Sequence, residues 1–388
     1  MPAQFLPGNR LTLLNSGDQY FPALIAAIDG ASEEIFVETY LFADDNTGRR
    51  VAAALSRAAQ RGVLVHLLVD GFGGGDFTAT LMGPLLAEGV QVMIYRPEVA
   101  RFRIRRRRLR RLHRKLVVID ARIGFVGGIN LIDDRNTPEQ IPPRFDFAVR
   151  VEGPLVDAMY RAMRQLWEVV VWANLKRRFR LLATALPAGP NPPAGTQTAA
   201  FVLRNNIRHR RDIEDAYLDA ILAARREILI ASAYFLPGRR FRRVLLAAAR
   251  RGVKVTILLQ GRVEYRLLHY ATQAIYGRLL ASGIRLFEYQ RSFLHTKVAV
   301  IDDDWATVGS SNIDPFSLML AKEANIVVRD AAFAGELRAS LQSAMADGAH
   351  ELDRKAWRRR WWGGRLLSWA SYQLARLLID VAGYGRHH

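Results

Sequence analysis

The chain has 388 residues, half of them hydrophobic, which is enough for two or three ordinary domains with sizeable cores. It contains no cysteine, which excludes disulfide bridges, thiolate metal sites and a cysteine nucleophile. Its 56 basic and 37 acidic residues give a formal charge of +19, which indicates an anionic partner: nucleic acid, an anionic membrane surface or a phosphate-bearing substrate. The first residues lack the pattern of a signal peptide, and no apolar run is long enough to predict a transmembrane helix.

The first part of the chain predicts helices and strands in alternation. Apolar residues at helical spacing indicate helices, short apolar runs indicate buried strands, and Arg61-Gly62 is a normal helix stop. The predicted elements are a helix over 20–28, a strand over 35–40, a helix over 51–59 and a strand over 63–69.

The same series returns after residue 200. Arg61-Gly62 recurs as Arg251-Gly252, 190 residues later (251 − 61). Alternating strands and helices predict two homologous α/β/α lobes with mostly parallel sheets. A Pro- and Gly-rich stretch separates the copies. We predict a first lobe over 1–185, a linker over 186–196, a second lobe over 197–350 and a C-terminal tail over 351–388.

One motif occurs in both lobes with identical spacing. Each copy reads His-x-Lys-x4-Asp-x6-Gly, with Asn three residues after the glycine, and the copies lie 182 residues apart (295 − 113). Two equal strings are very improbable by chance, so we interpret them as two halves of one active site. The motif residues are His113, Lys115, Asp120 and Asn130 in the first copy, and His295, Lys297, Asp302 and Asn312 in the second.

Two imidazoles and two ammonium groups suit phosphodiester chemistry without a metal. One neutral His attacks phosphorus while the other, protonated, donates to the leaving alcohol, and the roles then reverse. Lys115 and Lys297 would neutralise the non-bridging oxygens, to which Asn130 and Asn312 would donate hydrogen bonds. An acid is needed to fix the tautomer of each His.

These paired motifs on a duplicated α/β chain resemble the phospholipase D superfamily, and the wider chain closely resembles its two-lobed bacterial cardiolipin synthases. Strings that carry the wider resemblance include Gly17-Asp18-Gln19-Tyr20, the run from Phe145 to Pro154, and the run from Trp305 to Pro315. The resemblance implies a phosphatidyl–histidine intermediate and transfer of a phosphatidyl group from one phospholipid to phosphatidylglycerol, giving cardiolipin. It implies no cofactor and no metal.

The resemblance also assigns roles to further residues. By position, Asp146 and Glu323 match the family's His-orienting acids. Asp120 and Asp302 belong to the catalytic motif, although in the family they usually support the site's structure. Ser310 occupies a phosphate-binding position, whereas the first copy has Gly128 in the place where many members have Ser. We take His113 as the attacking histidine.

Two basic regions bear on the partner. Residues 101–115 are rich in Arg and end in the first motif, which fits either a solvated loop or an entry for anionic lipid. In the tail, tryptophans beside arginines precede a predicted amphipathic helix over 365–381, with Ser371 opposite its apolar stripe. This tail fits a helix packed on the body, a contact with another subunit, or an anchor at a membrane surface.

Three functions remain open on sequence alone: cardiolipin synthesis, hydrolysis of phospholipid or nucleic acid by the same fold, and non-catalytic nucleic-acid binding through 101–115. The Trp- and Arg-rich tail favours lipid. We therefore expect anionic phospholipids (phosphatidylglycerol, cardiolipin) and a membrane surface as partners and no nucleic acid. The resemblance implies a peripheral location on the cytoplasmic side of the inner membrane, and the sequence leaves the oligomeric state open.

Overall fold

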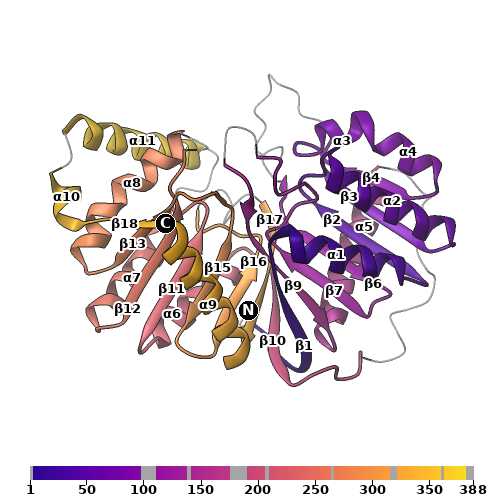
Figure 1. Ribbon diagram of the computed structural model, residues 1–388, viewed down its shortest axis with the longest axis horizontal. Coiled ribbons are helices and arrows are strands. Elements are labelled where there is room, and N and C mark those ends of the chain that lie inside the picture. The colour runs from indigo at the N-terminus through magenta and orange to yellow at the C-terminus, as the bar shows by residue number, and fades with distance from the viewer. Residues whose placement is uncertain are drawn as a thin grey trace.

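The computed structural model describes residues 3–97, 111–137, 141–174, 190–205, 209–263, 266–314, 321–359 and 362–381. Its two halves lie side by side (Figure 1). The first contains β1 (Leu6–Asn15), α1 (Ser16–Asp29), β2 (Glu34–Thr39), α2 (Asn46–Gln60), β3 (Leu64–Asp70), α3 (Gly75–Thr80), α4 (Met82–Ala87), β4 (Gln91–Tyr95), β5 (Arg111–Leu112), β6 (Lys115–Ile119), β7 (Ile123–Gly127), β8 (Arg144–Phe145), β9 (Phe147–Glu152) and α5 (Leu155–Ala173). The second contains β10 (Gln197–Arg204), α6 (Asp212–Ala223), β11 (Glu227–Ser232), α7 (Arg239–Arg250), β12 (Lys254–Gln260), α8 (Arg266–Ala281), β13 (Arg285–Tyr289), β14 (Phe293–Leu294), β15 (Lys297–Ile301), β16 (Trp305–Gly309), β17 (Ala321–Arg329), α9 (Ala331–Gly348), β18 (Ala349–Glu351), α10 (Arg354–Arg358) and α11 (Trp362–Val381).

The predicted alternation of helices and strands is confirmed, and its local causes are visible in the first half. Apolar residues of α1, spaced three or four apart, are buried, among them Leu24 and Ile28. The side chain of Asp45 accepts the backbone N–H of Gly48 and so caps the start of α2. Every residue of β3 after the first is buried, as its continuous apolar run predicts.

The prediction of mostly parallel sheets is wrong. Parallel pairing in the large sheet's main path is confined to the outer strands β2–β3–β4 and β11–β12–β13, which helices connect. The inner neighbours pair antiparallel, because short turns join β6 to β7 and β15 to β16. The strand order is β18-β13-β12-β11-β15-β16-β17-β10-β1-β9-β7-β6-β2-β3-β4.

The two halves share one continuous sheet and one central core. β1 pairs with β10, so the sheet crosses the boundary between the halves without a break (Figure 1). α5 and α9 pack in a common hydrophobic cluster with strands of both halves. α1 and α2 pack in a second cluster, and α6, α7 and α8 in a third. This arrangement is the predicted α/β/α layering, joined across the middle.

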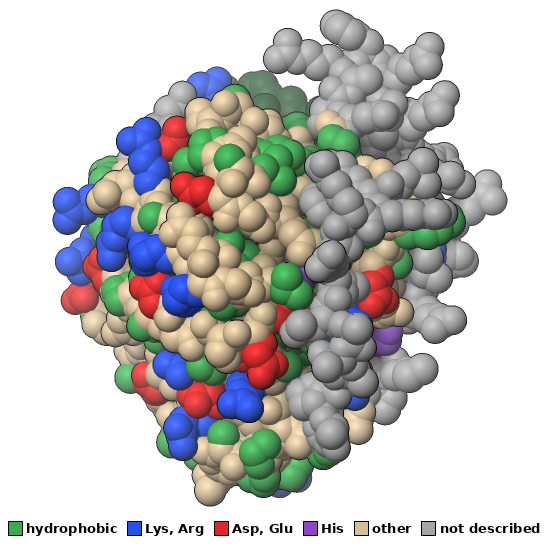
Figure 2. Space-filling model, turned by 90° about the vertical axis from the view of Figure 1, so that its right-hand side faces the viewer, with side chains coloured by type: hydrophobic (Ala, Val, Ile, Leu, Met, Phe, Trp, Pro, Cys, Tyr) green, Lys and Arg blue, Asp and Glu red, His purple; other side chains and the backbone are tan. Residues whose placement is uncertain are grey.

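The predicted linker 186–196 lies partly outside the described residues, and the domain boundaries stay a prediction. No helix in the described part of the chain is long and apolar enough to cross a membrane. On the side of the molecule seen in Figure 2, basic, acidic and hydrophobic side chains are interspersed. The described residues on that face therefore form no continuous basic patch.

Candidate active site

The two motif copies start at the same edge of the sheet. β6 is antiparallel to β2, and β15 is antiparallel to β11, so the residues before β6 and β15 lie at the carboxyl ends of β2 and β11. His113 and His295 are those residues. The ring of Tyr40, directly after β2, lies with its centroid 5.0 Å from that of His113. The β-α-β units thus determine that both histidines lie at the edge of the sheet formed by the carboxyl ends of β2 and β11.

Each histidine is held by backbone of the opposite half. The short strand β5, before His113, pairs with β17, and β14, before His295, pairs with β8. The N–H of His113 donates to the carbonyl of Lys322 (3.0 Å), and the N–H of His295 donates to the carbonyl of Phe145 (2.9 Å). The residues that follow those carbonyls are Glu323 and Asp146, so the crossing brings each histidine to an acid from the other half.

The predicted acids lie directly behind the histidines. Nδ1 of His113 is 3.0 and 3.1 Å from the two carboxylate oxygens of Glu323, and Nδ1 of His295 is 2.6 Å from Asp146. Glu323 is fully buried and Asp146 nearly so. A carboxylate at Nδ1 keeps the proton on that nitrogen and leaves the Nε2 lone pair for chemistry.

The two motif lysines are buried beside the histidines. Nζ of Lys115 donates to the carbonyl of His113 (2.7 Å), and Nζ of Lys297 donates to the carbonyl of His295 and lies 3.5 Å from Asp146. Arg114, between His113 and Lys115, points elsewhere and forms a buried ion pair with Glu38. The alternation predicted for the motif therefore places His and Lys together.

Burial dominates the electrostatics of this site. It lowers the pKa of His113, while the charge of Glu323 opposes the shift. It lowers the pKa of His295 well below its ordinary value, and Lys297 and Arg144 lower it further. Burial and the neighbouring Lys297 lower the pKa of Lys115 to about 7, against the attraction of Glu323. A bound phosphate would add negative charge beside these groups and so favour their protonated forms.

Ser310 and Gly128 occupy equivalent positions with different neighbours. The hydroxyl of Ser310 donates to Glu323 at 2.5 Å and is fully buried. At Gly128, a Cβ atom would lie 2.3 Å from both oxygens of Asp146. The carboxylate of Asp146 itself fills the space that a serine side chain would need. The structure therefore places Ser310 against the acid and explains the glycine in the first copy.

Asn130 and Asn312 each present an unsatisfied buried oxygen. Their side chains are 6 % and 4 % exposed, and in the described part of the chain neither Oδ1 has a hydrogen-bond partner. Buried polar atoms without a partner are uncommon in folded proteins, and a bound ligand is one explanation for them. Each orphaned oxygen could accept a hydrogen bond from a hydroxyl of a bound substrate, whereas donation from the amide N–H groups to the phosphate oxygens stays a prediction.

Asp120 and Asp302 lie at the opposite ends of β6 and β15 from the histidines, which favours a structural role, and their inclusion in the catalytic set stays a prediction. Asp120 accepts the backbone N–H groups of Ser32, Glu33 and Glu34 at 2.8–2.9 Å. Asp302 accepts the corresponding N–H groups of residues 225–227, which hold its pKa below the usual value although burial alone would raise it. Both adopt left-handed backbone (φ 49°) and fix the turn that starts the next strand.

One arginine that the sequence analysis missed belongs to this site. The guanidinium of Arg144 lies over the ring of Phe293 (5.3 Å) and donates to the carbonyl of Asn136. Its charge contributes to the lowered pKa of His295 and opposes the burial that raises the pKa of Asp146. In a chain with 56 Lys and Arg residues, no sequence signal singles it out.

Most of the basic run 101–115 lies outside the described residues, which resume at Arg111. Its end is fixed by Asp70, at the end of β3. Asp70 accepts the N–H of Leu112 (2.8 Å) and lies 3.6 Å from Arg111. The described end of the run, from Arg111 to the motif, is thus anchored beside the site.

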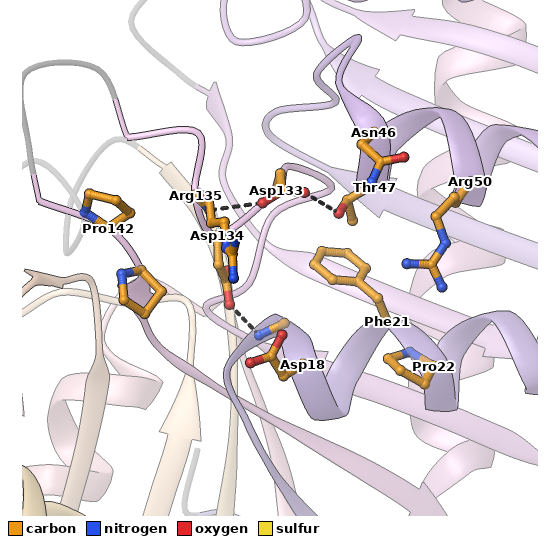
Figure 3. A pocket seen from close by; sticks show the side chains of 12 residues that line it. Asp18, Phe21, Pro22, Asn46, Thr47, Arg50, Asp133, Asp134, Arg135 and Pro142 are labelled. Atoms are coloured by element: carbon orange, nitrogen blue, oxygen red, sulfur yellow. Dashed lines mark hydrogen bonds between the residues drawn. The ribbon is translucent and has the colours of Figure 1, made fainter.

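A separate pocket of about 640 Å³ lies between the starts of α1 and α2 and the segment after β7. Figure 3 shows Asp133 and Asp134 pointing toward these helices, where they accept from the hydroxyl of Thr47 and the N–H of Gly17. Burial raises the pKa of Asp134 to about 6. Among the described residues, no group of three or more His, Asp or Glu side chains could hold a metal ion.

Comparison with known proteins identifies the family. The family described as "Cardiolipin synthase, PLD-like domain" matches residues 24–167 and 217–345, which hold both histidines. The chain belongs to this family. It is therefore an enzyme of the phospholipase D superfamily, as its resemblance implied.

Relatives of this cardiolipin synthase family match almost the whole chain. Cardiolipin synthase B of Escherichia coli is 39 % identical over 384 residues, covering 99 % of this chain and 92 % of the relative. Cardiolipin synthase A of Pseudomonas putida is 30 % identical, covering 86 % and 67 %. The crystal structure of phosphatidylserine synthase from Haemophilus influenzae superposes with a TM-score of 0.69 over 98 % of this chain and 97 % of that one, at 14 % identity, which shows the shared fold.

Proposed function

We propose that this protein is a cardiolipin synthase that transfers a phosphatidyl group to phosphatidylglycerol through a phosphohistidine. The observation that carries the proposal is the crossed arrangement, in which each motif histidine contacts the acid of the opposite half. The arrangement supplies two oriented imidazoles at one buried, lysine-lined edge of the sheet. The relatives named cardiolipin synthase supply the substrate class.

In the first step, Nε2 of His113 attacks the phosphorus of the donor phospholipid, and an N–P bond forms. The bond from phosphorus to the departing alcohol breaks, and His295, kept protonated at Nε2 by the charge of the bound phosphate and of Asp146, donates its proton to the alcohol oxygen. The alcohol leaves, while the phosphatidyl group stays on His113. Lys115 and Lys297 balance the charge on the non-bridging oxygens.

In the second step, His295 removes the proton from a free hydroxyl of phosphatidylglycerol. The oxygen attacks phosphorus, the N–P bond breaks, and its electron pair returns to Nε2 of His113. When the donor is also phosphatidylglycerol, the products are cardiolipin and glycerol. Water in place of this hydroxyl would give phosphatidic acid, which is the hydrolytic alternative.

We assign the attack to His113 because its partner Glu323 is itself fixed by the hydroxyl of Ser310. A nucleophile must keep one orientation through both displacements, and this hydrogen bond supports it. Digestion of protein quenched during turnover of phosphorus-labelled lipid, followed by peptide mapping, tests the assignment. Label on the His295 peptide would overturn the direction while keeping the mechanism.

The decisive experiment incubates purified protein with phosphatidylglycerol in mixed micelles and identifies the products by mass. Cardiolipin together with glycerol supports the proposal, whereas phosphatidic acid alone supports a hydrolase. His113→Ala and His295→Ala should each abolish turnover, and full activity of either variant would rule out a shared site. We further propose a peripheral location on the cytoplasmic side of the inner membrane, with anionic phospholipids as partners.

A further inference from the structure

Helix α11 exposes its large apolar side chains and buries its small ones. Ser368, Ser371 and Ala375 are 2 %, 8 % and 0 % exposed, and they lie on the side that packs against α8. The exposed side chains are Trp362, Leu366, Leu367, Trp369, Leu374, Leu377 and Leu378, each 45–69 % exposed. An amphipathic helix on a protein surface normally has the reverse arrangement. The outward face of α11 is therefore built to contact something apolar.

This orientation is fixed by specific contacts with the body. Ala375 packs with Ala271 of α8 and Leu236 in one small cluster. The hydroxyl of Tyr372 accepts a hydrogen bond from Arg242 of α7 (3.0 Å), whose guanidinium also lies near the tyrosine ring. Small residues allow α11 to approach α8 closely, and a turn of the helix about its axis would break these contacts. The apolar face consequently points away from the protein.

The charge around this face selects its occupant. From Arg354 to Leu378 the sequence has seven basic residues (354, 355, 358, 359, 360, 365 and 376) and no acidic one. Arg354 and Arg365 are exposed. Tryptophan and leucine bordered by arginine suit the boundary between acyl chains and anionic headgroups. A second copy of the chain would bring these same positive charges together.

The outward apolar face of α11 lies at the same side of the molecule as the active-site histidines. The histidines stand at the carboxyl ends of β2 and β11, and α8 starts after the carboxyl end of the parallel strand β12. Figure 1 shows α11 at the upper end of the molecule, the same end as α3, which follows β3. Phe72, in the loop between β3 and α3, is 60 % exposed there.

We propose that the outward face of α11 is a membrane-docking surface that lies in the interface of an anionic bilayer and turns the active-site edge toward its lipid substrates. The inference rests on the proposed use of phospholipids for its choice of occupant. Bilayer binding itself requires no turnover, so the two proposals can fail separately.

Flotation of the purified protein with vesicles tests this surface, using phosphatidylcholine with phosphatidylserine against phosphatidylcholine alone. The vesicles contain no phosphatidylglycerol, so no cardiolipin can form. We expect preference for the anionic vesicles. The variant Leu366→Gln/Leu374→Gln/Leu377→Gln should lower the partition coefficient about fivefold per leucine, or about a hundredfold. Gln keeps helix propensity close to that of Leu.

Leu222→Gln is the matched control, because Leu222 is 54 % exposed on α6 and lies outside the proposed surface. It should float like the wild-type protein. Arg365→Gln should weaken binding about fivefold and reduce its sensitivity to salt. As a second measurement, brominated acyl chains should quench less fluorescence in Trp369→Phe than in the wild-type protein.

Equal flotation of the wild-type protein and the triple variant would overturn the proposal. A dimer in sedimentation without lipid, converted to monomer by the triple variant, would overturn it too, since a second copy would then cover the face. If the wild-type protein binds these vesicles but makes no cardiolipin from phosphatidylglycerol in the separate mixed-micelle assay, the proposed function is refuted and the docking surface stands.

Discussion

Replacement of Glu323 by Gln removes the negative charge behind His113 while preserving the shape of the side chain. Both Glu323 oxygens lie within 3.1 Å of Nδ1, and the carboxylate is fully buried. An opposite charge at this distance raises the pKa of a histidine by about 1–3 units, which corresponds to about 1.4–4 kcal/mol. Burial disfavours positive charge on His113, so the attraction of Glu323 stabilises the charge that develops on the imidazole as Nε2 forms the N–P bond.

We therefore expect Glu323→Gln to lower turnover about 10- to 1000-fold. The amide N–H₂ of Gln can also donate to Nδ1, which would move the ring proton to Nε2 and block nucleophilic attack. Ser310 can still donate to the amide oxygen, so the fold should persist. Cardiolipin formation in micelles, measured across a range of pH, reports the effect, and unchanged KM would indicate that only the chemical steps are slowed.

The matched control is Glu34→Gln. Glu34 is also a buried carboxylate and lies 2.8 Å from a histidine, His66, but at the start of β2, away from the active-site edge. Its neutralisation should change stability and leave turnover within about threefold. Activity of Glu323→Gln within twofold of the wild-type protein would refute the reasoning, because the carboxylate would then have no part in holding or charging His113.

Three further outcomes follow from the geometry of the site. Gly128→Ala places a methyl group against the Asp146 carboxylate, so turnover should fall at least tenfold while circular dichroism stays native. Asp120→Ala removes the acceptor of three backbone N–H groups, so the free energy of unfolding in urea should fall by about 2–3 kcal/mol, and micellar activity of the remaining folded protein should persist. Since the pKa of Lys115 is about 7, its ammonium group is half protonated at that pH, nearly fully charged about one unit below it and largely neutral about one unit above it. Inorganic phosphate should inhibit less as pH rises through this range, by up to about tenfold per unit, whereas Lys115→Arg should flatten the dependence. A pH-independent inhibition constant in the wild-type protein would contradict the placement of that cation at the phosphate.

The sequence determined the local elements and the identity of the site residues. Strand and helix periodicity reflects burial along a single element, so 20–28 and 63–69 could be assigned without the fold. The equal spacing of the two motifs requires only a comparison of the chain with itself. What it could not supply was pairing between distant residues. The sequence predicted a mostly parallel sheet because its pattern shows the strands that helices connect, whereas the hairpins β6–β7 and β15–β16 pair antiparallel.

Tertiary structure alone decided how the halves meet. The contacts of His113 with Glu323 and of His295 with Asp146 span 210 and 149 residues, and the cross-half pairs β5–β17 and β8–β14 create them. The same holds for α11: periodicity shows an apolar stripe, but the direction of that stripe depends on what packs against the other side. Because Ala375 and its small neighbours fit against α8, the leucines face outward, a result that no property of the helix by itself could specify.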